Sequence, residues 1–269
     1  MPTVDVNGRK LGYTRRGSGE PLLLVPGMAM HSHIWDEPLL SALEHDFDVV
    51  AVDHRGVGES DDVPGEFSVV DLADDVAAVL DVLGSQSAHV LGFSLGGMVA
   101  QELVLRHPDR VRTLILASTY AGGAGSDLTA PGPMAMLQSM GTGNVDVALR
   151  AAFDANFSPA YVADERRYDY FKRVSLSGRL QVPTILAQAR AAFFHDASER
   201  LDQVRTPTLV VHGTADQIIL YSNGGHLATL VPGATLHTFD GVGHVFWWER
   251  PDETVALIRE HCLGRAAAA

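Results

Sequence analysis

A serine enclosed by glycines is the strongest chemical signal in the sequence. The stretch Gly92-Phe93-Ser94-Leu95-Gly96-Gly97 follows an apolar run and precedes a helical pattern. A sharp turn from strand to helix needs small neighbours, which the glycines supply, and it exposes the serine hydroxyl above the sheet. The backbone N–H of Leu95, at the helix N-terminus, then faces a developing oxyanion. The pattern predicts that Ser94 is a nucleophile.

A hydroxyl becomes nucleophilic when a base takes its proton and an acid orients that base. Of the twelve histidines, His244 lies in a flexible loop, Gly241-Val242-Gly243-His244, between a predicted strand and the last predicted helix. Asp216 follows the carboxyl end of another predicted strand, where open α/β sheets form their ligand sites. Asp240 is the competing acid, but it is too near His244 in sequence to reach around it easily. We therefore predict Ser94, His244 and Asp216 as nucleophile, base and orienting acid.

These residues depend on alternating strands and helices. Residues 4–6 and 11–13 flank Asn7-Gly8 and predict a hairpin. Continuous apolar runs predict strands that are buried on both faces, at 21–26, 48–53, 88–93, 112–117, 208–212 and 235–239. Helical spacing predicts helices at 69–83, 95–107 and 249–263, the first with a capping pattern at Ser68 and Asp71. The alternation indicates an α/β fold with a doubly wound, mostly parallel sheet.

One stretch interrupts this alternation. Residues 122–201 begin with a Gly- and Pro-rich segment and continue with helix-like segments that are rich in Ala, Met, Phe and Tyr, without a buried-strand run. A structureless loop of that length is uncommon in a compact domain. We therefore predict an inserted helical cap at 122–201, with the core formed by residues 1–121 and 202–265.

With these motifs in place, the sequence resembles the α/β-hydrolase superfamily over nearly the whole chain outside the cap. The order Ser94, Asp216, His244 is the order of that superfamily. Val25-Pro26-Gly27-Met28 is similar to its oxyanion loop, and residues 53–60 are similar to the turn after the next strand. The resemblance implies an oxyanion hole made by the backbone N–H groups of Met28 and Leu95. This chain has Pro26 where the family often has histidine, which leaves the anchoring of the loop open.

The resemblance also implies an activity. Residues 92–110 are similar to enol-lactonases of the 3-oxoadipate type and related carboxylesterases, and they also resemble cofactor-free haloperoxidases, or perhydrolases. Ser94 excludes haloalkane dehalogenases and epoxide hydrolases, which have aspartate there. We expect a serine hydrolase that cleaves a small, largely apolar carboxylic ester or lactone through an acyl-enzyme. The alternatives are a C–C bond hydrolase or perhydrolase that uses the same residues and, in another class, a small-molecule receptor on this fold.

Substrate contacts are predicted from position along the chain for five residues, Trp35, Phe93, Met134, Phe153 and Val245. The cap residues among them have an alternative role, which is to pack the cap helices on one another. His31 and His33 suggest a metal pair, but no third ligand follows at a suitable spacing. We expect no metal and no cofactor.

Composition narrows the choice of partners. The 269 residues include 20 Lys and Arg against 33 Asp and Glu, a net charge of −13, which argues against nucleic acid and against anionic membranes. No run of about 18 apolar residues predicts a membrane span. The single cysteine, Cys262, excludes a disulfide framework. We expect a cytoplasmic protein whose partner is a small-molecule ester or lactone, and the sequence leaves a homo-oligomer open.

Overall fold

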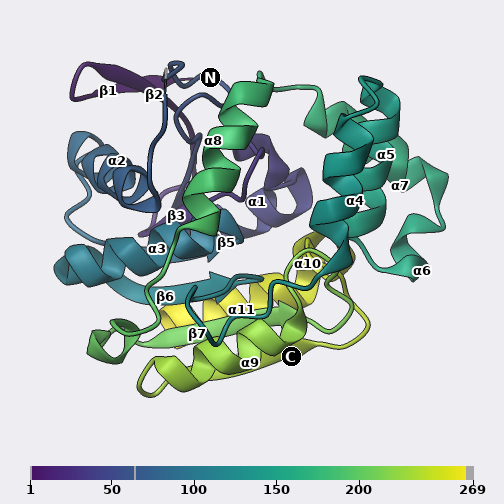
Figure 1. The fold of residues 1–269 in the computed structure, drawn as a ribbon. Coiled ribbons are helices and arrows are strands. Elements are labelled where there is room, and N and C mark those ends of the chain that lie inside the picture. Colours follow the sequence, from purple (N-terminus) through teal and green to yellow (C-terminus); the bar gives the residue numbers. More distant parts are fainter. Residues whose placement is uncertain (1, 64, 265–269) are drawn as a thin grey trace.

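A twisted sheet forms the centre of the molecule (Figure 1). The computed structural model describes residues 2–63 and 65–264, so residues 1 and 265, the outer limits of the predicted core, lie outside the described residues. The strand order is β1-β2-β4-β3-β5-β6-β7-β8, with antiparallel pairing for β1–β2 and β2–β4 and parallel pairing for the rest. The strands are β1 (Thr3–Val6), β2 (Arg9–Arg16), β3 (Glu20–Val25), β4 (Phe47–Val52), β5 (Ala88–Phe93), β6 (Val111–Ala117), β7 (Thr208–Gly213) and β8 (Thr235–Phe239). The predicted mostly parallel sheet is confirmed.

The predicted hairpin at the N-terminal edge is also confirmed. Val6 pairs with Arg9, so Asn7 and Gly8 form a two-residue turn. Both turn residues have positive φ, 54° and 79°, as a type I′ turn requires. An asparagine followed by a glycine adopts this conformation at little energetic cost, and for this reason the dipeptide predicts a hairpin turn.

Two layers of helices cover the sheet. Residues of α2, α3 and α9 share a hydrophobic cluster on one face, and residues of α1, α10 and α11 share a cluster on the other. The bounds are α1 (Glu37–Leu43), α2 (Val69–Val82), α3 (Leu95–Arg106), α9 (Tyr221–Leu230), α10 (Phe246–Glu249) and α11 (Pro251–Leu263). Ser68 and Asp71 form the predicted capping box of α2. The doubly wound arrangement follows from these two layers.

The last helix differs from the prediction of a single helix over 249–263. Its segment is divided into α10 and α11 at Arg250, which has non-helical φ and ψ of −137° and 61°. The residue before a proline is sterically disfavoured in the helical region, and Arg250 precedes Pro251. The proline then begins α11, where its missing N–H is tolerated.

Five helices lie between β6 and β7: α4 (Pro131–Met140), α5 (Val145–Asn156), α6 (Pro159–Val162), α7 (Glu165–Ser175) and α8 (Val182–Phe193). They divide into two groups in Figure 1, with α8 against α3 and the helices α4 to α7 together on the other side. Within 122–201 the only strand-like pairing is an isolated bridge between Leu180 and Val57. The helical content agrees with the predicted cap, whose limits at 122 and 201 stay a prediction.

The two ends of this insertion meet. Ala197 N–H donates to the Ala121 carbonyl at 2.8 Å. Gly122 has φ +83°, and a Cβ there would lie 2.1 Å from the His195 carbonyl oxygen. The chain therefore leaves the core and returns to it at nearly the same point, and a glycine is needed where the two segments cross.

Candidate active site

Ser94 lies on a tight turn between β5 and α3. Its φ and ψ are 54° and −119°, a conformation that costs a non-glycine residue about 1–3 kcal/mol. A Cβ at residue 92 would lie 2.3 Å from the Gly96 carbonyl oxygen, and one at residue 96 would lie 2.1 Å from the Val25 oxygen. Both glycines are required by close backbone approach, as the sequence predicted.

The backbone of Ser94 is fixed by hydrogen bonds, and its hydroxyl is not used by the helix. Its N–H donates to the Ala117 carbonyl at 2.9 Å, and the Thr119 hydroxyl donates to the Ser94 carbonyl at 2.8 Å. The side chain makes no capping hydrogen bond to α3 and is 8% exposed. Leu95 begins α3, and the first N–H groups of a helix have no carbonyl partner one turn earlier in the helix.

His244 and Asp216 are brought together in the folded chain. His244 Nδ1 lies 2.6 Å from Asp216 Oδ2, and both side chains are buried. The imidazole packs on the ring of Phe93, the residue before Ser94, with ring centroids 4.6 Å apart. Asp240, the competing acid, is exposed and accepts a hydrogen bond from Thr214 instead. Of the two candidate acids, Asp216 is the one that contacts His244.

The Asp216 carboxylate is held on both oxygens. Oδ1 accepts from the N–H groups of Ile218 and Ile219 at 2.8 and 2.9 Å. His212, which is fully buried at the end of β7, places Nε2 3.3 Å from Oδ2. Burial alone would raise the pKa of Asp216, but the charge of His244 and the hydrogen bonds of His212 and His244 outweigh it and hold that pKa well below its usual range. The carboxylate therefore stays ionised beside the imidazole.

The loop that carries His244 is braced by the insertion. Val245 N–H donates to the Asn156 carbonyl at 3.1 Å. The carboxylate of Glu249 accepts from Gly243 N–H at 2.9 Å, from Ser158 N–H at 3.0 Å and from the Ser158 hydroxyl. A Cβ at residue 243 would lie 2.7 Å from backbone atoms of Phe157. The end of α5 therefore fixes the path of the histidine loop.

The predicted oxyanion loop runs against Ser94. A Cβ at Gly27 would lie 3.1 Å from Ser94 Cβ, so Gly27 and Met28 pass close to the serine. His54 Nε2 donates to the Pro26 carbonyl at 3.0 Å and so anchors the loop from the turn after β4. Burial lowers the pKa of His54, which keeps the imidazole neutral. The hydrogen bond from His54 therefore anchors the loop although Pro26 replaces the histidine that is common in the family. His54 lies within residues 53–60, the turn that resembles the turn of the superfamily.

The five predicted substrate contacts fall into different surroundings. Trp35 is buried against Phe93 and Trp247, and Val245 is buried in the histidine loop. Phe153 is buried among aromatic rings of the insertion, and Met134 is 58% exposed on α4. Of the five, Phe93 packs its ring on the His244 imidazole, and contact with substrate stays a prediction for all five.

The sequence did not predict the roles of three residues that hold the site in place: His212, His54 and Glu249. Each of them contacts a residue on another loop or on the far side of a turn, and the spacing of residues along the chain does not reveal such a contact. The nearest sequence signal is His212 at the end of a predicted strand, four residues before Asp216.

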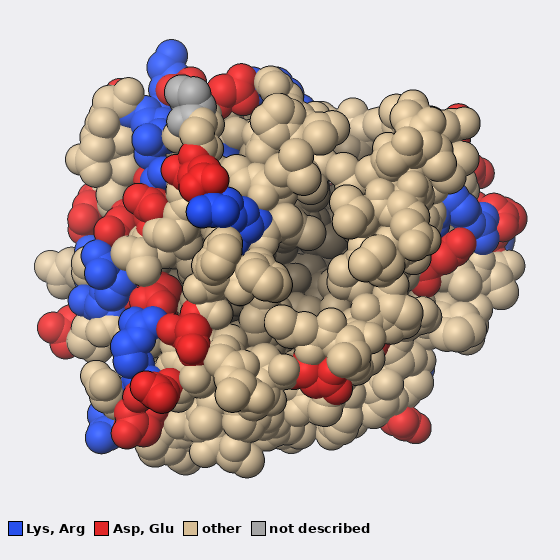
Figure 2. Space-filling model, viewed as in Figure 1, with Lys and Arg blue, Asp and Glu red and all other residues tan. Residues whose placement is uncertain are grey.

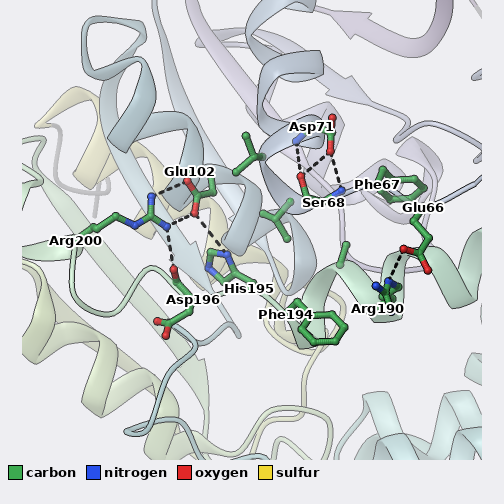
Figure 3. A pocket seen from close by; sticks show the side chains of 13 residues that line it. Glu66, Phe67, Ser68, Asp71, Glu102, Arg190, Phe194, His195, Asp196 and Arg200 are labelled. Carbon is green, nitrogen blue, oxygen red and sulfur yellow. Dashed lines mark hydrogen bonds and ion pairs between the residues drawn. The ribbon is translucent and has the colours of Figure 1, made fainter.

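The face of the molecule seen in Figure 2 is hollowed between α8 and α4, and mostly uncharged side chains surround the hollow. A separate cavity of about 530 Å³ lies between α2, α3 and α8 (Figure 3). Its lining includes the Glu102–Arg200 ion pair, His195 and the Glu66–Arg190 pair. The lining of this second cavity combines these charged side chains with apolar ones such as Phe67, Val69 and Phe194.

In the part of the chain that the structure describes, no group of three or more His, Cys, Asp or Glu side chains could hold a metal ion. His31 Nε2 contacts the Val174 carbonyl at 3.1 Å. Across residues 2–63 and 65–264, no helix combines the length and apolar character needed to cross a bilayer.

Comparison with known proteins places this arrangement in a wider group. Residues 20–251 match the family model described as alpha/beta hydrolase fold. A protein of Azorhizobium caulinodans named "Putative carbamate hydrolase RutD" is 28% identical over 97% of this chain and 98% of its own length.

Solved structures agree with the sequence match. Est816, described as an N-acyl homoserine lactone degrading enzyme, is 30% identical with a TM-score of 0.81, covering 96% of this chain and 99% of that one. The enol-lactonase of Burkholderia xenovorans LB400 has a TM-score of 0.84 over 97% and 99% of the two chains. At 23% identity, the second comparison supports the fold alone.

Proposed function

The chain belongs to the alpha/beta hydrolase fold family, and from that membership we propose that it is a serine hydrolase that cleaves a small, largely apolar carboxylic ester or lactone. The observation that carries the proposal is the 2.6 Å contact between His244 and Asp216, on a loop that packs against the strained turn of Ser94. A buried histidine oriented by an ionised carboxylate beside a serine is the arrangement that activates a hydroxyl.

The reaction begins with attack on the carbonyl. Since Nδ1 of His244 is bonded to Asp216, Nε2 takes the Ser94 proton as Oγ bonds to the carbonyl carbon. The negative charge that develops on the carbonyl oxygen is stabilised by the N–H groups of Leu95 and Met28. In comparable sites the loss of one such donor costs about 3–4 kcal/mol of transition-state stabilisation.

Acyl transfer then proceeds in two halves. The C–O bond to the alcohol breaks, and His244 donates its proton to the departing oxygen, leaving the acyl group on Ser94. Water next attacks the acyl carbon, with His244 as base, and the acid leaves as the serine regains its proton. In a lactone both products remain one molecule. The uncharged surroundings of the hollow favour an apolar substrate (Figure 2).

A carbamate is a second candidate substrate, because the A. caulinodans relative is named a putative carbamate hydrolase and is similar to this chain over almost its full length. A carbamate presents the same electrophilic carbonyl, so the same residues would serve. C–C bond cleavage and perhydrolysis also use this set. We place the reaction in the cytoplasm on a small molecule, in line with the single cysteine of the chain.

The test compares purified wild type with Ser94→Ala and with Ser85→Ala, a half-buried serine beyond the end of α2. A panel of p-nitrophenyl esters, lactones, phenyl carbamates and vinylogous diketones identifies the substrate class, and peracid formation from hydrogen peroxide reports perhydrolysis. Ser94→Ala should lose turnover by at least about 10⁴-fold with unchanged circular dichroism, while Ser85→Ala should match wild type. A fluorophosphonate should phosphonylate Ser94, with loss of fluoride, in wild type and in Ser85→Ala, and it should leave Ser94→Ala unlabelled. Full esterase activity in Ser94→Ala would overturn the assignment, and oxygenase activity that survives it would indicate a cofactor-free oxygenase.

A further inference from the structure

One polar side chain of the insertion reaches the predicted oxyanion loop. Gln188 lies on α8, and its side chain is fully buried. The N–H of Ala29 donates to Gln188 Oε1 at 2.8 Å, across 159 residues of sequence. A buried carboxamide at this distance is a directed contact and not an incidental one.

The residue that Gln188 holds has an unusual backbone conformation. Ala29 has φ +61°, in the left-handed region, where only glycine is at ease. The peptide unit that joins Met28 to Ala29 carries the N–H that Gln188 binds, so fixing its direction restricts the conformation of Met28 itself. The proposed oxyanion donor at Met28 therefore depends on a peptide unit that is held from the insertion.

The other end of the same carboxamide has no partner. Gln188 Nε2 is buried without a hydrogen-bond acceptor among the described residues. Because Nε2 and Oε1 share one carbon atom, this unused donor lies beside the oxyanion loop. Buried donors are normally satisfied, and one left open beside a reaction site points to an acceptor that arrives with the ligand.

We propose that Gln188 is a positioning residue for the oxyanion hole and a determinant of specificity. Its Oε1 holds Ala29 so that Met28 N–H points to the reacting carbonyl, and its Nε2 donates to a second oxygen of the substrate close to that carbonyl. This inference rests on the serine-hydrolase function proposed above. It narrows the substrate class to esters or lactones that carry an acceptor oxygen near the scissile bond.

The first arm of the test measures the positioning role with Gln188→Met, which keeps the length of the side chain and removes both polar atoms. The expected loss is about 10- to 100-fold in kcat with KM within about threefold, because the oxyanion hole acts in the transition state. The inhibition constant of a trifluoromethyl ketone should rise by the factor by which kcat/KM falls. Gln181→Met, an exposed glutamine at the N-terminus of the same helix, is the matched control and should behave as wild type.

Ala29→Gly in the Gln188→Met background supplies a rescue that a merely structural role would not give. Glycine adopts positive φ without strain, so the loop should regain its conformation and recover at least about fivefold in kcat. Should Gln188→Met fail to fold, Ala29→Val replaces it, since a β-branched residue opposes positive φ while Gln188 stays in place. That variant should show the same loss in kcat.

The second arm measures the substrate contact with two isosteric ester pairs: p-nitrophenyl methoxyacetate against butyrate, and 2-methoxyethyl acetate against butyl acetate. Within one pair, we divide kcat/KM for the methoxy ester by kcat/KM for its alkyl isostere. This ratio should be at least about fivefold lower in Gln188→Met than in wild type, and the intrinsic reactivity of the two esters cancels when the two enzymes are compared. Unchanged ratios in both pairs, or a Gln188→Met enzyme that equals Gln181→Met, overturn the inference. If wild type hydrolyses no ester and forms no Ser94 adduct, the proposed function has failed instead.

Discussion

The two groups of helices in the insertion contact different loops of the site. Helix α8 reaches the predicted oxyanion loop through a hydrogen bond from the Ala29 N–H to the buried side chain of Gln188. The junction of α5 and α6 reaches the His244 loop through the Asn156 carbonyl and through Ser158, which shares the Glu249 carboxylate with Gly243. One insertion therefore contacts both the loop that is proposed to stabilise the oxyanion and the loop that carries the proposed base, His244.

The two groups differ in how they are packed. The helices α5, α6 and α7 form an aromatic cluster that extends into the core through Trp248. The C-terminal end of α8 instead leaves large apolar side chains in solvent, with Phe193 69% exposed and the following Phe194 67% exposed. Regions with fewer buried apolar contacts open at lower free energy. The comparison teaches that the loop of the base is held beside an aromatic cluster, whereas the oxyanion loop is held by a helix whose C-terminal end exposes aromatic rings.

The largest effect should come from the residue that neither group of helices supplies. Asp216→Asn replaces an acceptor-only carboxylate by an amide that can donate to His244, which favours the wrong tautomer. In a comparable site this change lowers kcat by about 10⁴-fold. Steady-state kinetics should show that loss for Asp216→Asn and wild-type activity for Asp240→Asn. Comparable losses in both variants would show that the 2.6 Å contact is not the one that orients the base.

A smaller effect should follow from weakening the support of the histidine loop. Glu249→Gln leaves one acceptor oxygen where the carboxylate accepts three hydrogen bonds, from Gly243 N–H and from two groups of Ser158. The free energy of unfolding should fall by about 1–3 kcal/mol, with a loss in kcat of about 10-fold as His244 becomes less well placed.

Urea unfolding and kinetics on the same preparations measure both quantities for Glu249→Gln. Glu260→Gln, at an exposed carboxylate near the C-terminal end of α11, is the control and should change neither. A loss of stability with kcat unchanged would show that Glu249 stabilises the fold but does not help to position His244.

The last effect is on stability alone, with no change expected in kcat, and it concerns pH and the α8 side, where the insertion returns to the core. Burial lowers the pKa of His195 to about 4, against the opposing charge of Glu102, and His195 lies 3.2 Å from Gln101 Oε1. Below pH 6.5 the unfolded chain takes up a proton that the folded chain refuses until about pH 4. Stability is therefore lost as pH falls through this window, by at most about 3 kcal/mol.

Comparison with His195→Gln isolates this contribution. Between pH 7.5 and pH 4, the unfolding free energy of wild type should fall relative to that of His195→Gln, by at most about 3 kcal/mol. Asp36, whose pKa burial raises to about 6, contributes with the opposite sign but equally in both proteins. A difference that is constant with pH would mean that His195 is not kept neutral by the fold.

Sequence sufficed where local chemistry dictates structure. The strands, the Asn7-Gly8 turn and the glycines around Ser94 follow from periodicity, positive φ and close backbone approach, which act over a few residues. It did not suffice for His54, Glu249 or Gln188, because their partners lie on loops that only the topology brings near. Nor could it separate Phe153, buried within the insertion, from Met134, exposed on α4, since both are apolar residues at helical positions.

The meeting of the insertion's two ends has a consequence for engineering and for divergence. Because Ala121 and Ala197 are joined by a 2.8 Å hydrogen bond, the core spans the same short gap whatever lies between them. A segment of another length can be grafted at this junction without altering the course of β6 or β7. The insertion can thus be exchanged as a unit, provided that its replacement supplies new partners for the core residues that it contacts, among them Ala29, Gly58, Asn223 and Gly243.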